Sequence, residues 1–228
     1  MLGPRLATRT YIVKGCTLQS HAKAGARVRQ SRYVPHRAAS NLSRAVSFAG
    51  EIGRPLDTLV TINYGLTYTD ERDMTAAFRR LIKSFYGKWF ARHPAHRMIA
   101  DKAPTYVWVA EGRPGHHGIH WLVYLPFDLK AEFERQLPRW IQKTAGDLLD
   151  TKAVQVQHAW RPAGAAEYML KGLRPSHAKR YKIKAVFQGD VYGKRCAVSE
   201  NLGPTAIRRY REAKAAAASC EADALAAG

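Results

Sequence analysis

The sequence predicts an α+β domain in which an antiparallel sheet is covered by helices. Between residues 55 and 175, short runs of β-branched and aromatic residues, which are typical of strands, alternate with stretches whose apolar residues recur at helical spacing. Two of the strand-like runs are joined by a glycine-containing turn at 112–115, so we expect them to pair antiparallel. Because each element must bury an apolar side, helices on one face of the sheet are the economical arrangement.

The first half of this region predicts a strand, a helix and a second strand. A strand is expected over residues 56–63, and Thr69 or Asp70 can then cap a long amphipathic helix that runs to about residue 89. The nearly continuous apolar run at 105–111 is typical of a central strand. The apolar stripe of the long helix, which we expect to face the core, consists of Met74, Phe78, Leu81, Ile82, Phe85 and Trp89.

The second half predicts a strand, a helix, a strand and a helix. After the strand at 119–125, Asp128 can cap a helix that Pro138 is expected to kink. Alternation of apolar and polar residues predicts a half-buried strand over 154–160, and a short helix is expected over 165–173.

Three segments are expected along the chain. The first fifty residues contain nine Lys or Arg and no acidic residue, which predicts a basic flexible arm over 1–54. Residues 55–175 form the expected folded domain, and residues 176–228 predict a basic connector, a strand at 185–191 and an alanine-rich C-terminal helix. The arm also has the composition of an organellar transit peptide, but we favour an arm that follows phosphates.

The chain is strongly basic, with 37 Lys and Arg against 18 Asp and Glu and a formal net charge of +19. Such a charge attracts polyanions, and nucleic acid is the expected partner because no lipidation signal or amphipathic basic helix points to a membrane. No apolar run approaches the roughly 18 residues that cross a bilayer, so we expect a soluble protein. The three cysteines form no CxxC pair, which favours reduced thiols in a cytosol.

Histidines gather at the start of the second predicted strand of the hairpin. His116, His117 and His120 precede the apolar run that ends at residue 125, and neutral imidazole is a common ligand of divalent metals. Glu111 ends the preceding strand, so a hairpin would bring its carboxylate toward His120. The cluster therefore predicts a metal site, with a histidine-rich surface turn as the alternative.

A tyrosine and a lysine form the second candidate for chemistry. Tyr168 and Lys171 are three residues apart on a predicted helix and hence on one face, and Ala165 and Ala166 allow another surface to approach closely. A neighbouring ammonium favours phenolate character and balances charge on a phosphate, so Tyr168 can act as a nucleophile on phosphorus. The alternative is a tyrosine that only decorates a helix surface.

The order of these motifs, a histidine-bearing strand followed by a Tyr-x-x-Lys helix, resembles the HUH endonucleases. This superfamily comprises rolling-circle replication initiators, relaxases and single-tyrosine transposases, and the chain looks most like the replication-associated proteins of phages and plasmids. The resemblance implies histidines on a central strand, Mg²⁺ or Mn²⁺, and cleavage of single-stranded DNA that leaves a 5′-phosphotyrosine. The stretches that carry it are 61–63, 106–111, 118–126 and 167–173, and similar segments follow at 193–196 and 199–204.

The resemblance also implies a role for each candidate residue. His120, with His117 and Glu111, would hold the metal on the scissile phosphate, Tyr168 would attack it, and Lys171 would steady the charge. The released 3′-hydroxyl would prime rolling-circle replication in the cytoplasm of a bacterial host, with the origin strand or a hairpin as substrate and host replication proteins as further partners. The alternatives are a single-tyrosine transposase and a non-catalytic nucleic-acid-binding protein with a degenerate metal site.

One position departs from the pattern of the superfamily, which has two histidines at alternate positions of one strand. The position two before His120 is Gly118, and His116 lies on the same face but about 13 Å away. A bulge at the flexible glycines of this segment would swing His117 inward and restore a pair, and a metal-poor site is the alternative. His158, on the later strand, is expected to be packed rather than to bind metal.

Overall fold

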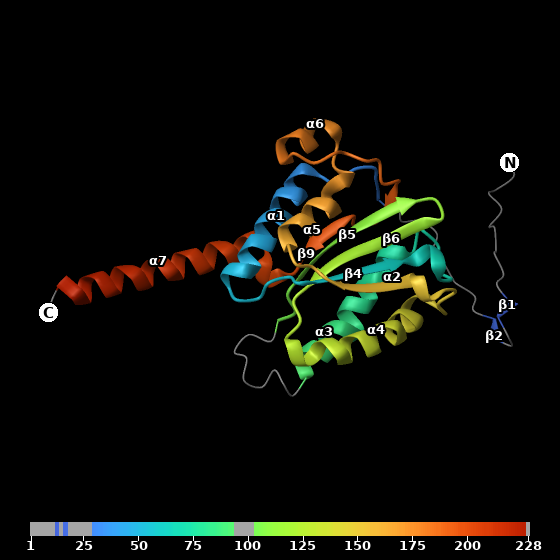
Figure 1. The fold of residues 1–228 in the computed structure, drawn as a ribbon, viewed down its shortest axis with the longest axis horizontal. Helices are drawn as coiled ribbons and strands as arrows, with labels where there is room; N and C mark the ends of the chain where they lie inside the picture. The colour runs from blue at the N-terminus through green and yellow to red at the C-terminus, as the bar shows by residue number, and fades with distance from the viewer. Residues whose placement is uncertain (1–11, 14–15, 18–28, 94–102, 227–228) are drawn as a thin grey trace, which may run out of the picture.

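The computed structural model describes residues 12–13, 16–17, 29–93 and 103–226, and its centre is a five-stranded antiparallel sheet (Figure 1). The strand order is β7-β4-β6-β5-β9, so β6, which carries the histidines, is the middle strand. The predicted α+β class with an antiparallel sheet is confirmed at this level. The strands of this sheet are β4 (Thr58–Asn63), β5 (Tyr106–Arg113), β6 (His116–Val123), β7 (Val154–His158) and β9 (Cys196–Val198).

Helices cover both faces of the sheet, so the expectation of one covered face is wrong. In Figure 1, α1 and α5 lie above the sheet, and α2, α3 and α4 lie below it. The reason is that β5 and β6 are apolar on both sides: Val107 and Leu122 belong to the core with α1 and α5, and Trp108 and Trp121 belong to the other core. The helices are α1 (His36–Glu51), α2 (Met74–Arg80), α3 (Gly87–Arg92), α4 (Lys130–Ala145) and α5 (Pro162–Met169).

The long amphipathic helix is present as one helical stretch. A π-helical turn, Leu81–Tyr86, joins α2 to α3. The helix begins at Met74 rather than at residue 70, because the Asp70 carboxylate accepts a hydrogen bond of 2.9 Å from the backbone N–H of Arg72 and forms a turn. Pro138 lies inside α4, which continues to Ala145.

The expected flexible arm over residues 1–54 is wrong for residues 36–51, which form α1. This helix packs on the sheet through an apolar face that combines alanines with larger residues. Composition averages over a segment and ignores the helical spacing of its apolar residues, which explains why composition alone indicated disorder. Residues 1–11, 14–15 and 18–28 of the arm lie outside the described residues. The buried side chains of α1 are Ala39, Leu42, Ala45, Val46, Phe48 and Ala49.

The chain beyond residue 175 completes the folded domain rather than following it. The strand expected at 185–191 is replaced by two shorter strands, of which β9 forms an edge of the main sheet. Buried Arg195 donates hydrogen bonds to the carbonyl oxygens of Ser31 (2.7 Å) and Gly189 (2.9 Å), which ties this region to the segment that precedes α1. The remaining short elements are β1 (Ile12–Val13), β2 (Cys16–Thr17), β3 (Gln30–Ser31), α6 (Pro175–Ala178) and β8 (Val191–Tyr192).

The alanine-rich C-terminal helix is present as α7 (Pro204–Ala226). Figure 1 shows that it extends away from the sheet as a single rod. No helix in the described part of the chain has the length and apolar character needed to cross a membrane.

Candidate active site

Four of the predicted site residues meet on the face of the sheet that carries α5. In the β5–β6 ladder, Val109 stands opposite His120 and Glu111 stands opposite Gly118. Directly opposed residues of antiparallel strands share a face, so Glu111 and His120 point to the same side. Tyr168 lies in the last turn of α5, and Lys171 lies in the 3₁₀ turn that follows.

Glu111 is the centre of this cluster. Its Oε1 atom lies 2.8 Å from His120 Nε2 and 2.8 Å from Lys171 Nζ, and Arg113 Nη2 lies 3.7 Å from Oε2. The Glu111 side chain is 7% exposed, and those of His120 and Lys171 are each 12% exposed. The carboxylate therefore joins an imidazole and an ammonium in a largely dry setting.

Glu111 is held in its ionised form. Burial by itself would raise the pKa of the carboxyl group, but the hydrogen bonds and charges of His120 and Lys171 outweigh burial and lower the pKa from 4.5 to about 2. The carboxylate consequently stays charged at neutral pH and fixes the positions of both partners.

The lowered pKa predicts a contribution of Glu111 to stability that acid removes. Because the pKa is lower in the folded chain than in the unfolded chain, the stabilisation is present above about pH 4.5 and is lost as the pH falls toward 2. Such a shift corresponds to about 3 kcal/mol. We expect urea unfolding of the wild type and of Glu111→Gln to differ most at neutral pH and to converge toward pH 2. A difference that stays constant over this range would contradict the assignment.

Thr61 completes the support of His120, and the sequence analysis gave it no role. It stands opposite His120 across the β4–β6 ladder, and its Oγ1 lies 3.1 Å from His120 Nδ1. Because a carboxylate only accepts, Nε2 donates to Glu111 and Nδ1 of the neutral ring accepts from the Thr61 hydroxyl. A hydroxyl can also accept, so Thr61 tolerates the tautomer in which Nε2 is free to bind a metal.

Tyr168 is the accessible member of the cluster. Its side chain is 54% exposed, Lys171 Nζ lies 3.8 Å from the ring centroid, and the His120 ring meets the Tyr168 ring edge to face at 5.5 Å. A cation over an aromatic face stabilises both groups. The structure thus places an exposed phenol beside a buried His–Glu–Lys cluster.

His117 does not join this cluster, and the expected bulge is wrong. The β5–β6 register runs unbroken from Tyr106 opposite Val123 to Arg113 opposite His116. His117 therefore lies on the other face of the sheet, where its Nε2 is 3.1 Å from the carbonyl oxygen of Thr69.

Positions 116, 118 and 158 do not provide His120 with a second histidine partner either. A Cβ atom at Gly118 would lie 2.6 Å from the carbonyl oxygen of Ile62, so β4 leaves no room for a side chain at this position. His116 is exposed, and His158 is exposed as well rather than packed. Its ring lies 4.2 Å from that of Trp160.

Two side chains of the cluster, those of Glu111 and His120, are suitable ligands for a divalent cation. Within the described ranges, no group of three His, Cys, Asp or Glu side chains could hold a metal ion. His120 and Glu111 supply one nitrogen and one carboxylate on the face that Tyr168 borders. A hard cation such as Mg²⁺ commonly uses one or two protein ligands and completes its shell with water and substrate phosphate, so this pair suits a site that fills together with its substrate.

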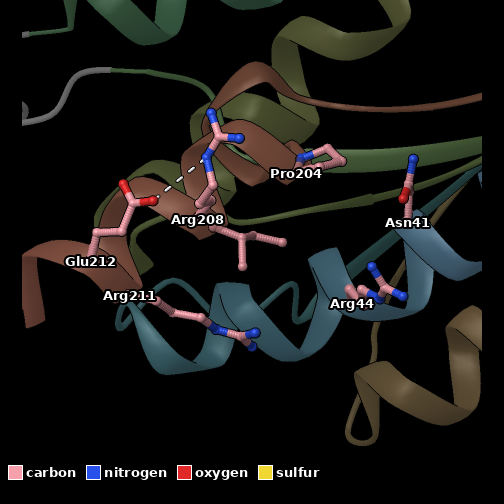
Figure 2. Close-up of a pocket in the computed structure, with 7 residues that line it drawn as sticks. Asn41, Arg44, Pro204, Arg208, Arg211 and Glu212 are labelled. Carbon is pink, nitrogen blue, oxygen red and sulfur yellow. Dashed lines mark ion pairs between the residues drawn. The ribbon is translucent and has the colours of Figure 1, made fainter. Parts of the chain in front are cut away.

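A cavity lined by basic residues lies between α1 and α7 and is separate from the cluster around Glu111 (Figure 2). It is a cavity of about 310 Å³, in which Arg208 pairs with Glu212 at 3.7 Å while Arg44 and Arg211 add two further guanidinium groups. This excess of positive charge suits phosphate contacts. The residues that line the cavity are Asn41, Arg44, Pro204, Ile207, Arg208, Arg211 and Glu212.

Comparison with known proteins does not extend this picture. No protein-family model, curated protein or solved structure matches the chain significantly. The residues of the cluster and the charge of the chain are therefore the features that indicate a function.

Proposed function

We propose that the protein cleaves and rejoins single-stranded DNA through a covalent bond to Tyr168 and thereby initiates rolling-circle replication of a phage or plasmid. The observation that carries the proposal is the exposed Tyr168 ring, packed against Lys171 and His120 above the buried Glu111 carboxylate. The net charge of +19 supports a nucleic-acid substrate. A single-tyrosine transposase would use the same chemistry.

The proposed reaction is a transesterification at phosphorus. The Tyr168 oxygen forms a bond to the phosphorus atom, and the bond from phosphorus to the 3′ oxygen breaks. The phenol releases its proton, and the departing 3′ oxygen takes one up to become a hydroxyl. The number of phosphoester bonds is unchanged, so attack by a 3′-hydroxyl on the phosphotyrosine can rejoin the strand.

The buried residues would prepare this step. Glu111 holds Lys171 beside the Tyr168 ring, where the ammonium can offset negative charge on the phosphate. Glu111 and His120 would also hold Mg²⁺ or Mn²⁺, which when bound polarises the phosphate. Thr61 would orient the His120 ring both for its hydrogen bond to Glu111 and for metal binding.

Two observations favour the non-catalytic alternative. His117 lies on the opposite face, and Lys171 contacts the same Glu111 oxygen that His120 contacts. A protein that only binds nucleic acid could keep such a cluster for stability.

A covalent-adduct assay separates the two functions. The full chain is incubated with a labelled pool of single-stranded oligonucleotides of random sequence and with Mg²⁺ or Mn²⁺, and the products are separated on a denaturing gel. We expect a labelled protein–DNA adduct whose peptide maps to Tyr168. Binding of the pool without any adduct in either metal would favour the non-catalytic function.

The basic N-terminal segment should neutralise phosphates of the bound strand. Deletion of residues 1–28, which removes five Lys or Arg and spares α1, is expected to flatten the dependence of log affinity on log salt by about 0.7 for each phosphate that the segment neutralises. Titration of single-stranded DNA at several salt concentrations measures the slope. An unchanged slope would indicate that the segment does not touch DNA and would favour a targeting role.

A further inference from the structure

Trp160 is an exposed tryptophan just before α5, the helix that carries Tyr168. It follows β7 and precedes α5, and its side chain is 86% exposed. The chain has five tryptophans, and Trp160 alone among them is exposed. The other four, Trp89, Trp108, Trp121 and Trp140, are buried or half-buried. The indole therefore offers a large aromatic surface on which a ligand can pack.

The indole is held in place rather than displayed on a loose loop. The ring of His158 meets it edge to face at a centroid distance of 4.2 Å. The backbone N–H of Ala159 donates to the carbonyl oxygen of Asp57 at 2.6 Å. Pro162, two residues after Trp160, begins α5. A fixed aromatic ring with free surface is the arrangement on which unpaired bases stack.

Helix α5 connects Trp160 with the catalytic face, because Trp160 precedes the helix and Tyr168 lies in its last turn. β7 is an edge strand, and its exposed Gln155 stands opposite Thr61, which in turn stands opposite His120. Opposed residues share a face, so Gln155 lies on the side of His120. Tyr168 follows the first residue of α5, Pro162, by about 9 Å along the helix axis.

We propose that Trp160 stacks on an unpaired base of the same DNA strand that Tyr168 attacks. This inference rests on the proposed function for its substrate class. Stacking on the indole needs a base that is free of its complement, so Trp160 selects single strands over duplex. The neighbouring Arg161 is exposed and can contact the phosphate of the same nucleotide.

Phe127 provides a matched control. Its side chain is 87% exposed, and it follows β6 at the same end of the sheet, where Val123 and His158 both stand opposite Thr58. Phe127 precedes α4, however, and is not attached to α5. A general loss of exposed aromatic surface should therefore affect both positions, and loss of a stacking site should affect Trp160 alone.

The test measures binding without cleavage. In a Tyr168→Phe background, a single-stranded oligonucleotide should quench tryptophan emission. Trp160→Ala should remove most of that quenching and weaken binding by roughly five- to 150-fold, the range of one base stack. Trp160→Phe should retain part of the affinity, and Phe127→Ala should bind within about two-fold of the parent. Binding to a duplex of the same sequence should not respond to Trp160→Ala.

An abasic scan locates the stacked base. One abasic position should weaken binding to the parent as much as Trp160→Ala does, and it should cost nothing further in the Trp160→Ala variant. Equal loss in Phe127→Ala, or unchanged binding in Trp160→Ala, would overturn the inference. Tryptophan emission that changes with protein concentration in the absence of DNA would instead assign Trp160 to contacts between copies and would also overturn it.

The two proposals fail in different ways. Quenching and affinity that depend on Trp160, without a covalent adduct in the parent chain, would leave stacking intact and reject nicking. An adduct together with Trp160→Ala binding at parental affinity would leave nicking intact and reject stacking.

Discussion

Tyr168→Phe is expected to abolish the covalent adduct while leaving affinity for single-stranded DNA within a few-fold. The phenol oxygen is the group that would bond to phosphorus, and phenylalanine has no substitute for it. The ring itself keeps its contacts with Lys171 (3.8 Å) and His120 (5.5 Å). Because the side chain is 54% exposed, we expect stability to change by less than about 0.5 kcal/mol.

The measurement is the denaturing-gel adduct, with Tyr68→Phe as the matched control. Tyr68 is 60% exposed and is not part of the cluster, so its variant should form adduct like the wild type. An adduct that persists in Tyr168→Phe would reject Tyr168 as the nucleophile, and Tyr106, Tyr124 and Tyr181 would then need the same substitution.

His120→Ala is expected to remove metal-stimulated cleavage. His120 supplies the nitrogen donor of the pair, and its Nε2 lies 2.8 Å from the Glu111 carboxylate. Glu111 keeps its ion pair with Lys171 in this variant, so the cluster retains a charged partner and the fold should persist. Cleavage rates at increasing Mn²⁺, together with a thermal unfolding curve, separate loss of chemistry from loss of fold.

His117→Ala is the control that the structure supplies. The ring contacts the carbonyl oxygen of Thr69 on the opposite face, so cleavage should stay within a few-fold of the wild type. A His120→Ala variant that cleaves like its parent would reject the metal role and leave Lys171 as the cation at the phosphate.

Strand positions were accessible from the sequence because β-branched and aromatic runs are local signals. The number of layers was predicted wrongly, because helices were expected on one face only, although the continuous apolar run in β5 already indicated burial on both sides. The helix α1 was missed because the first fifty residues, with nine basic residues and no acidic one, look disordered by composition, although the buried residues of α1 recur at helical spacing.

In the site, too, contacts between residues close in sequence were predictable, and a contact between distant residues was not. The Tyr168–Lys171 pair lies within one turn, and the Glu111–His120 pair is closed by a hairpin, so sequence spacing predicted both. The contact of Thr61 with His120 depends on the register of two strands far apart in the chain, which spacing does not reveal.

The glycines of the hairpin explain why the predicted bulge in β6 does not form. Gly115 adopts a φ of +72° in the turn that joins β5 to β6, so its freedom serves the turn rather than a bulge. Gly118 is needed where two backbones approach closely.

The close approach at Gly118 limits how this chain could evolve or be engineered. Replacing the glycine by histidine to recreate a two-histidine strand would push its Cβ against the carbonyl oxygen of Ile62 and force β4 to move. Thr61, the adjacent residue of β4, holds the Nδ1 atom of His120. Grafting the second ligand alone would therefore disturb the first, and a gain of metal affinity requires coordinated changes in both strands.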